Sequence, residues 1–215
     1  MSTAQYALDI LYRDQAIVVV NKPGGLLAVP GRGPEKQDSV VARLKALFPD
    51  CLEQPSVHRL DMATSGLMVL ARTKSAHRDL SIQFEQRAVV KRYEALVLGQ
   101  VEGEQGMIDL PFRLDPDNRP YQVYDEEHGK RGVTHWKALR RDEHTTRLEF
   151  FPHTGRTHQL RLHASHAKGL GCPIVGDALY GTGRDGEQMF LHATGLQITH
   201  PESKEVLCFF SPPPF

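Results

Sequence analysis

Segments with the pattern of β-strands follow one another along much of this chain, and this order most constrains its fold. Residues 91–101, 133–141 and 145–152 alternate apolar with polar side chains and are rich in strand-forming types, and residues 190–200 and 204–211 form two closing strands. Parallel strands need a long crossover between them, whereas consecutive strands joined by short connections pair antiparallel. The sequence therefore predicts an α+β fold with a mixed, mainly antiparallel sheet and flanking helices.

Helical spacing of apolar side chains occurs in three segments. Residues 38–48 predict a helix that has Asp38 or Ser39 as its N-cap, and residues 74–87 predict a second helix. Residues 154–169 predict a third, which begins at a Thr cap and stops at its final glycine.

Three further segments are assigned by composition. Residues 16–21 predict a buried strand that ends at a Pro-Gly-Gly turn, and residues 66–73 predict another strand. Lys22, just before the turn, is interpreted as a loop residue. Residues 102–132 are rich in Pro, Gly, Asp and Asn, so we expect long hairpin connections there.

Composition narrows the class of protein. The length of 215 residues suits one larger domain or two small ones, and we expect a single domain over residues 1–215. No apolar run is long enough to cross a membrane, and the N-terminus resembles neither a signal nor a transit peptide, so we expect a cytoplasmic protein. Three distant cysteines without a C-x-x-C motif argue against a disulfide framework or a cysteine zinc site.

The formal net charge is zero, with 26 basic and 26 acidic residues, but the charges are unevenly distributed. Residues 150–176 contain no acid, although they include arginines, histidines and a lysine. Such segregation would give a neutral protein one positive face. From charge alone, an acidic partner and a merely solvated basic helix are equally good interpretations.

Several common chemistries lack their signatures. The glycine-rich residues 176–186 lack the Lys-Ser/Thr ending of a phosphate-binding loop, and Ser65 lacks the G-x-S-x-G elbow. The histidines considered as metal ligands are His153, His158, His163 and His166. No H-E-x-x-H motif or nearby carboxylate accompanies them, and interleaved arginines would repel a cation, so we predict no metal site.

Asp61 is the carboxylate that invites a chemical role. It is the only acid between Glu53 and Asp79, a window that also holds four basic residues. Nearby positive charge keeps a carboxylate ionised, which suits a nucleophile or an electrostatic stabiliser. Glycoside hydrolysis would need a second carboxylate, and none is close in sequence. On local sequence alone, an Asp that ties a turn through an arginine salt bridge is the favoured interpretation.

The motif around Asp61 is part of a longer resemblance. Residues 58–67, "HRLDMATSGL", resemble the catalytic signature of the RluA family of pseudouridine synthases. Residues 21–31, 91–99 and 153–181 and the "LHA" of 191–193 resemble other motifs of that family, in the same order. The resemblance runs from about Ile10 to the C-terminus.

The resemblance implies the pseudouridine synthase catalytic fold and the isomerisation of uridine to pseudouridine in RNA, without cofactor or metal. By its position in the motifs, Asp61 matches the catalytic aspartate. Tyr93 matches the tyrosine that stacks on the target base, and Arg156 the basic partner of the aspartate. Leu160 matches an apolar residue of the pocket. Arg59 matches an arginine that fills the stack left by an extruded base.

Five further residues are expected to bind substrate because they lie within the matched motifs: His58, Thr64, His158, Gln159 and Arg161. By pattern alone, several of the matched residues are equally typical of a packed core or a solvated helix. The resemblance also implies an RNA partner, an rRNA or tRNA stem-loop, and we expect a monomer without the S4-type N-terminal domain of many relatives.

Two other functions remain open at this point. An RNA-binding or assembly factor that has lost catalysis would keep the fold, and a hydrolase could use Asp61 on a nucleoside. Retained Asp61, Tyr93 and Arg156 argue against the first, and the missing second carboxylate argues against the second. The sequence does not specify which uridine is modified.

Overall fold

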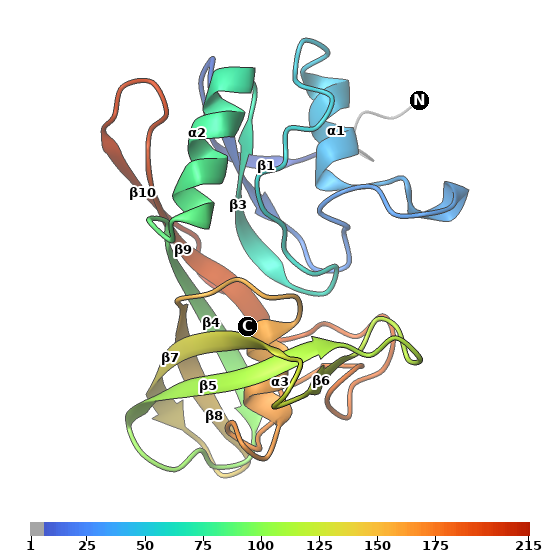
Figure 1. Cartoon of the computed structure of the whole chain (residues 1–215), viewed down its shortest axis with the longest axis vertical. Coiled ribbons are helices and arrows are strands. Elements are labelled where there is room, and N and C mark those ends of the chain that lie inside the picture. The colour runs from blue at the N-terminus through green and yellow to red at the C-terminus, as the bar shows by residue number, and fades with distance from the viewer. Residues whose placement is uncertain (1–6) are drawn as a thin grey trace. The chain divides into compact units, whose positions relative to one another are not determined.

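The computed structural model in Figure 1 describes residues 7–215 and divides into two compact units. The first unit combines the described residues up to Lys91 with Ala193–Pro214, and the second contains Arg92–His192 and Phe215. The expectation that residues 1–215 act as one catalytic domain stays a prediction.

The first unit is built on antiparallel strands. β1 (Asp9–Arg13) pairs with β2 (Ile17–Lys22), β2 pairs with β3 (Ser65–Ala71), and β9 (Leu191–Thr199) pairs with β10 (Val206–Phe210). Every residue of β3 is buried, as expected for a strand that is covered on both faces.

Two α-helices and a short 3₁₀-helix, Pro34–Lys36, complete the first unit. Ser39 is the N-cap of α1 (Val40–Leu47), and its side chain accepts a hydrogen bond from the backbone N–H of Ala42 at 3.1 Å. α2 (Lys74–Glu85) is capped in the same way by Thr73. The core that α2 shares with the strands includes Ile17, Val19, Leu67, Val69, Ala76 and Leu80.

The outer side of β3 is covered in part by the segment that precedes it. The backbone N–H of Ala71 donates to the carbonyl of Pro55 at 2.8 Å, and Ser56 forms an isolated antiparallel bridge with Leu70. At the other end of β3, Gly66 has φ +112°, and a Cβ there would lie 2.4 Å from the carbonyl oxygen of Ala193. The position therefore requires glycine.

The second unit is an antiparallel sheet with one helix. Its strands lie in the order β4 (Val90–Leu98), β8 (Thr145–Pro152), β7 (Lys130–Arg141), β5 (Gln105–Leu114) and β6 (Gln122–Tyr124). The single helix, α3 (Gln159–Ser165), lies beside this sheet in Figure 1. Buried side chains of the unit include Ala95, Val97, Ile108, Leu110, Phe112, Leu148 and Phe150.

The predicted α+β class with a mainly antiparallel sheet is confirmed. Two local predictions are wrong. The region 102–132, expected to be long connections, contains the ten-residue strand β5 and also β6. The third helix begins at Gln159 rather than at a Thr cap, because His158 before it has a left-handed backbone that a helix cannot include. It ends at Ser165, because His166 is extended. Among residues 7–215, no helix is long and apolar enough to cross a membrane.

Candidate functional site

Asp61 lies in a tight turn that leads into β3. The backbone N–H of Thr64 donates to the carbonyl of Asp61 at 3.1 Å, which closes the turn, and Thr64 is buried. The next peptide carbonyl, that of Met62, accepts two hydrogen bonds at 2.9 Å, from the N–H of Gly25 and from the ammonium of Lys22. The backbone that follows the carboxylate is therefore fixed by hydrogen bonds.

Lys22 is the residue that sequence reasoning missed. It is the last residue of β2 rather than part of a loop, and it is fully buried. Its Nζ donates to the carbonyls of Pro23 at 3.0 Å, Leu26 at 2.7 Å and Met62 at 2.9 Å. Burial lowers the pKa of Lys22 to about 7, and the charge of Asp61 acts in the opposite direction. A buried ammonium thus joins the end of β2 to the turn that carries Asp61.

His58 connects the beginning of the same turn to β3. Its Nε2 accepts a hydrogen bond from the backbone N–H of Val69 at 3.1 Å, and its ring stacks on Phe84 with centroids 4.5 Å apart. Burial, aided by the charge of Lys91, lowers the pKa of His58 to about 3. The ring is therefore neutral, with its proton on Nδ1. These contacts are internal, and the expected contact of His58 with substrate stays a prediction.

Arg59 is exposed and, with Val57 and His58, lines a cavity of the first unit. The first unit thus brings together four predicted site residues within one short segment: His58, Arg59, Asp61 and Thr64.

The second unit holds the remaining predicted site residues, around the start of α3. Gln159 is buried and organises this region. Its Oε1 accepts from the hydroxyl of Thr154 at 2.7 Å and from the backbone N–H of Arg156 at 2.9 Å, and its Nε2 donates to the hydroxyl oxygen of Thr134 at 3.0 Å. Gln159 therefore positions the backbone of Arg156, whose residue is exposed.

His158 occupies the position before α3 with a left-handed backbone, φ 56°. Its Nδ1 lies 2.9 Å from the hydroxyl of Tyr180, and that hydroxyl oxygen accepts from the backbone N–H of Gln122 at 2.7 Å. The Tyr180 hydroxyl therefore links the ring of His158 to the backbone of Gln122.

Arg161 forms a buried ion pair instead of facing solvent. Its Nε and Nη2 donate to the two carboxylate oxygens of Asp177 at 2.8 and 2.6 Å, and its guanidinium lies over the ring of Tyr180. Burial acts to raise the pKa of Asp177, but the hydrogen bonds and charge of Arg161 outweigh it and hold that pKa below its usual range. The pair fixes α3 against the loop that contains Asp177.

Tyr93 and Leu160 lie on different elements of the second unit. Tyr93 is half-buried on β4, where it pairs with Phe150 of β8, and Leu160 is buried in the first turn of α3. Asp61 belongs to the first unit and Arg156, Tyr93 and Leu160 to the second. The expected pairing of Asp61 with Arg156 stays a prediction, as does the placement of Tyr93 and Leu160 against the target base.

Residues 150–176, which contain no acid, contribute less positive charge to the surface than their sequence suggests. Arg161 is neutralised by Asp177, and His163 is fully buried with a pKa lowered to about 4, chiefly by burial. Arg156 and Lys168 remain exposed. Across residues 7–215, no three side chains of His, Cys, Asp or Glu gather closely enough to hold a metal ion. The expectation of a metal-free site remains a prediction.

Comparisons with known proteins cover nearly the whole chain. The family model described as RNA pseudouridylate synthase matches residues 16–166. A Haemophilus influenzae protein named "Dual-specificity RNA pseudouridine synthase RluA" is 45% identical over 206 residues, which are 94% of this chain and 91% of the relative. The Escherichia coli K12 protein of the same name is 43% identical over 212 residues, 97% of this chain and 94% of the relative. Among solved structures, human RNA Pseudouridylate Synthase Domain Containing 1 aligns with a TM-score of 0.78 and 28% identity, covering 100% of this chain and 87% of the other.

Proposed function

The chain belongs to the RNA pseudouridylate synthase family, and we propose that Asp61 is the carboxylate with which it isomerises uridines in structured RNA. Membership makes the protein an isomerase: the bond from uracil N1 to the ribose C1′ is broken and a bond from C5 to C1′ is formed. N1 gains a proton and C5 loses one, so the product has the same atoms as the substrate.

The observation that carries the proposal is the fixed turn around Asp61. Lys22 and Gly25 hold the Met62 carbonyl, Thr64 closes the turn, and the ammonium of Lys22 acts on the carboxylate through its charge. A preorganised carboxylate stabilises positive charge that develops at C1′ as the glycosidic bond breaks. It serves this role ionised, whether it attacks C1′ itself or assists a glycal route.

The other residues divide the remaining tasks. A base inside folded RNA has to leave the stack before its C1′ can be reached, at a cost of a few kcal/mol. Arg59 enters the gap and stacks on the neighbouring bases, which recovers part of that cost. By the family's motifs, Tyr93 and Leu160 enclose the freed uracil while it turns, and Arg156 is the basic partner of the aspartate. Gln159 supports this last role by holding the backbone of Arg156.

The substrate is proposed from the names of the relatives. Proteins called dual-specificity RNA pseudouridine synthases cover more than nine-tenths of this chain, so we assign the chain an rRNA and a tRNA stem-loop as substrates. It acts as a monomer and without a metal ion. Exposed Arg59, Arg156 and Lys168 supply phosphate contacts, which make binding weaken as salt rises.

Tritium release from RNA labelled at C5 of uridine tests the role of Asp61. Wild-type protein should release tritium from tRNA and from fragments of large-subunit rRNA, and Asp61→Asn should release none while still binding RNA. Asp50→Asn is the matched control, because Asp50 is an exposed acid of the same unit that pairs with Arg72 on the surface.

The products separate the other functions. Tritium release by Asp61→Asn at the wild-type rate would refute the assignment of Asp61. RNA binding by the wild type without tritium release would indicate an inactive binding factor, and free uracil would indicate a nucleoside hydrolase.

A further inference from the structure

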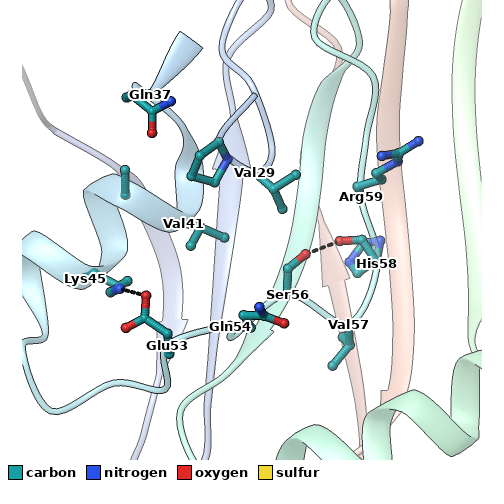
Figure 2. A pocket seen from close by; sticks show the side chains of 12 residues that line it. Val29, Gln37, Val41, Lys45, Glu53, Gln54, Ser56, Val57, His58 and Arg59 are labelled. Carbon is teal, nitrogen blue, oxygen red and sulfur yellow. Dashed lines mark hydrogen bonds and ion pairs between the residues drawn. The ribbon is translucent and has the colours of Figure 1, made fainter. Parts of the chain in front are cut away.

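The cavity of the first unit that Val57, His58 and Arg59 line is also formed by residues well before the Asp61 turn. The cavity has a volume of about 800 Å³, within the range of sites that take small organic ligands. Figure 2 shows the side chains that line it. One wall is a side of α1, with Val41, Ala42 and Lys45, and another is the segment that ends in His58 and Arg59.

The lining combines an apolar surface with hydrogen-bonding groups at its edges. Val29, Val41 and Val57 provide aliphatic contacts, which suit the flat faces of a base. The amides of Gln37 and Gln54 border the same space, and that of Gln54 can both donate to and accept from a base edge.

Two polar side chains of the lining, Gln37 and Ser56, are held in place by hydrogen bonds to backbone carbonyls. The Nε2 of Gln37 donates to the carbonyls of Gly31 at 3.2 Å and Gly33 at 2.6 Å, which leaves its Oε1 as the group available to a ligand donor. The hydroxyl of Ser56 donates to the carbonyl of His58 at 2.5 Å, so its oxygen is available as an acceptor.

The charge of the cavity favours an anion. Lys45 and Arg59 contribute two positive charges, and Glu53 contributes one negative charge. Lys45 and Glu53 pair at 2.7 Å, but Glu53 is 86% exposed, so the pair is weak and readily exchanged for a phosphate. Arg59 is exposed at the side of the cavity next to Asp61.

The cavity is close along the chain to Asp61, the proposed catalytic carboxylate. Arg59 is two residues from Asp61, and two extended residues span at most about 7 Å. A nucleotide bound at the Arg59 end of the cavity would therefore be close to the uridine whose C1′ meets Asp61.

We propose that the cavity between α1 and residues 53–59 binds an unpaired nucleotide of the substrate RNA that lies beside the target uridine. This rests on the proposed function of Asp61 and adds a second base-binding site to it. The base lies against Val41 and Val57, its edge meets Gln37 and Gln54, and its phosphate meets Lys45. RNA with this base displaced binds best, so the site selects loops over paired stems.

The test has two parts: a protein variant that fills the cavity, and RNA probes that lack the base beside the target uridine. Ala42→Tyr places a ring in the cavity from α1, and Leu47→Tyr places the same ring on another, exposed side of the same helix. The RNA probes are stem-loops with the modified uridine intact and an abasic site one or two nucleotides from it. Both the KM for tritium release and the dissociation constant of labelled RNA are measured.

We expect Ala42→Tyr to raise KM and Kd by about tenfold, the scale of a single base contact, with kcat little changed. Leu47→Tyr should leave both unchanged. One of the abasic substitutions should weaken wild-type binding by a similar factor and should not weaken Ala42→Tyr further, because the two changes remove the same contact. Additive losses, or no loss in a folded Ala42→Tyr protein, would overturn the proposal.

A milder variant guards against misfolding. Lys45→Gln keeps the helix and removes one cation, so the dependence of log K on log salt should become shallower by about 0.7, the value for one phosphate of a single strand. An unchanged slope counts against the proposal. Free AMP and UMP form a separate arm: saturable binding that Ala42→Tyr abolishes, together with additive RNA losses, would assign the cavity to free nucleotides instead.

The binding measurements do not depend on catalysis. If wild-type protein released no tritium, the proposed role of Asp61 would fail, while the dissociation constants would still show whether the cavity and the neighbouring base act together.

Discussion

Replacing Lys22 by Met tests whether the buried ammonium beside Asp61 is as strongly perturbed as its surroundings imply. In the folded chain Lys22 has a pKa of about 7, against an ordinary value of 10.5. Between these two values the unfolded chain binds more protons than the folded one. Stability therefore rises with pH across this window, by at most about 1.4 kcal/mol per pH unit for one group.

The size of the effect follows from that slope. At pH 7 the folded-state group is half-titrated, so the slope begins at half its maximum and then approaches the full value. From pH 7 to pH 9 the contribution of Lys22 to the free energy of unfolding should increase by about 2 kcal/mol. Lys22→Met removes this increase, and it also leaves the carbonyls of Pro23, Leu26 and Met62 without their shared donor.

Urea unfolding of wild type and variant at pH 7, 8 and 9 measures the difference. The stability of the wild type should gain about 2 kcal/mol relative to Lys22→Met over this range. Lys74→Met, on the exposed start of α2, is the control and should follow the wild type. Parallel pH profiles for wild type and Lys22→Met would refute the inference that Lys22 pays a large burial penalty. Tritium release should fall in Lys22→Met even where the protein is folded, because the turn that carries Asp61 loses a support.

Three further predictions concern the supports of the two units. His58 has a folded-state pKa of about 3, so between pH 6.5 and 4.5 the unfolded chain binds more protons than the folded chain and stability falls. Over this range the free energy of unfolding of His58→Gln, measured with urea, should fall by about 2 kcal/mol less than that of the wild type. Asp177→Ala leaves the Arg161 guanidinium buried without its partner and should cost about 3–5 kcal/mol, followed by the fluorescence of the single tryptophan. Gly66→Ala places a methyl group against the backbone of Ala193, and it should lower the thermal midpoint more than Gly25→Ala, where the Cβ meets nothing within 4 Å. Equal shifts for the two glycine variants would contradict the close approach.

Local sequence predicted the features that local physics decides. Alternation identified the strands β4, β7 and β8, and the apolar run of residues 16–21 identified β2. Ser39 was one of the two expected caps because a hydroxyl before an apolar helical face commonly fills that role. These elements depend on contacts within a few residues or on which face is buried.

The missed features depend on contacts between distant segments. Lys22 resembles a loop residue until the carbonyl of Met62, forty residues later, is placed against it. Arg161 resembles a solvated cation until Asp177 pairs with it, and α3 starts late because Gln159 bonds to Thr154 and to the backbone of Arg156. No pattern of spacing or composition contains these pairings.

For the candidate site, the matched motifs named the residues and the structure supplied their supports. Asp61, Arg59 and Thr64 came from the resemblance, as did Arg156 and Tyr93. The roles of Gln159 as a backbone clamp and His58 as a neutral acceptor came from burial and hydrogen bonds. A signal for Lys22 does exist in the sequence: it lies two residues after Val20 in the same strand pattern, so its side chain points to the same buried face.

The segment that leads to Asp61 also completes one edge of β3. β3 lies between β2 and β9 in the sheet, and Pro55 and His58 take up the backbone N–H groups of Ala71 and Val69, which would otherwise be left open on the edge that faces β9. An open strand edge is a template for intermolecular association. Substitutions that loosen this segment should therefore have two outcomes at once: slower isomerisation of uridine and a tendency of the protein to self-associate. Selection for solubility alone would then preserve the geometry on which the Asp61 turn depends.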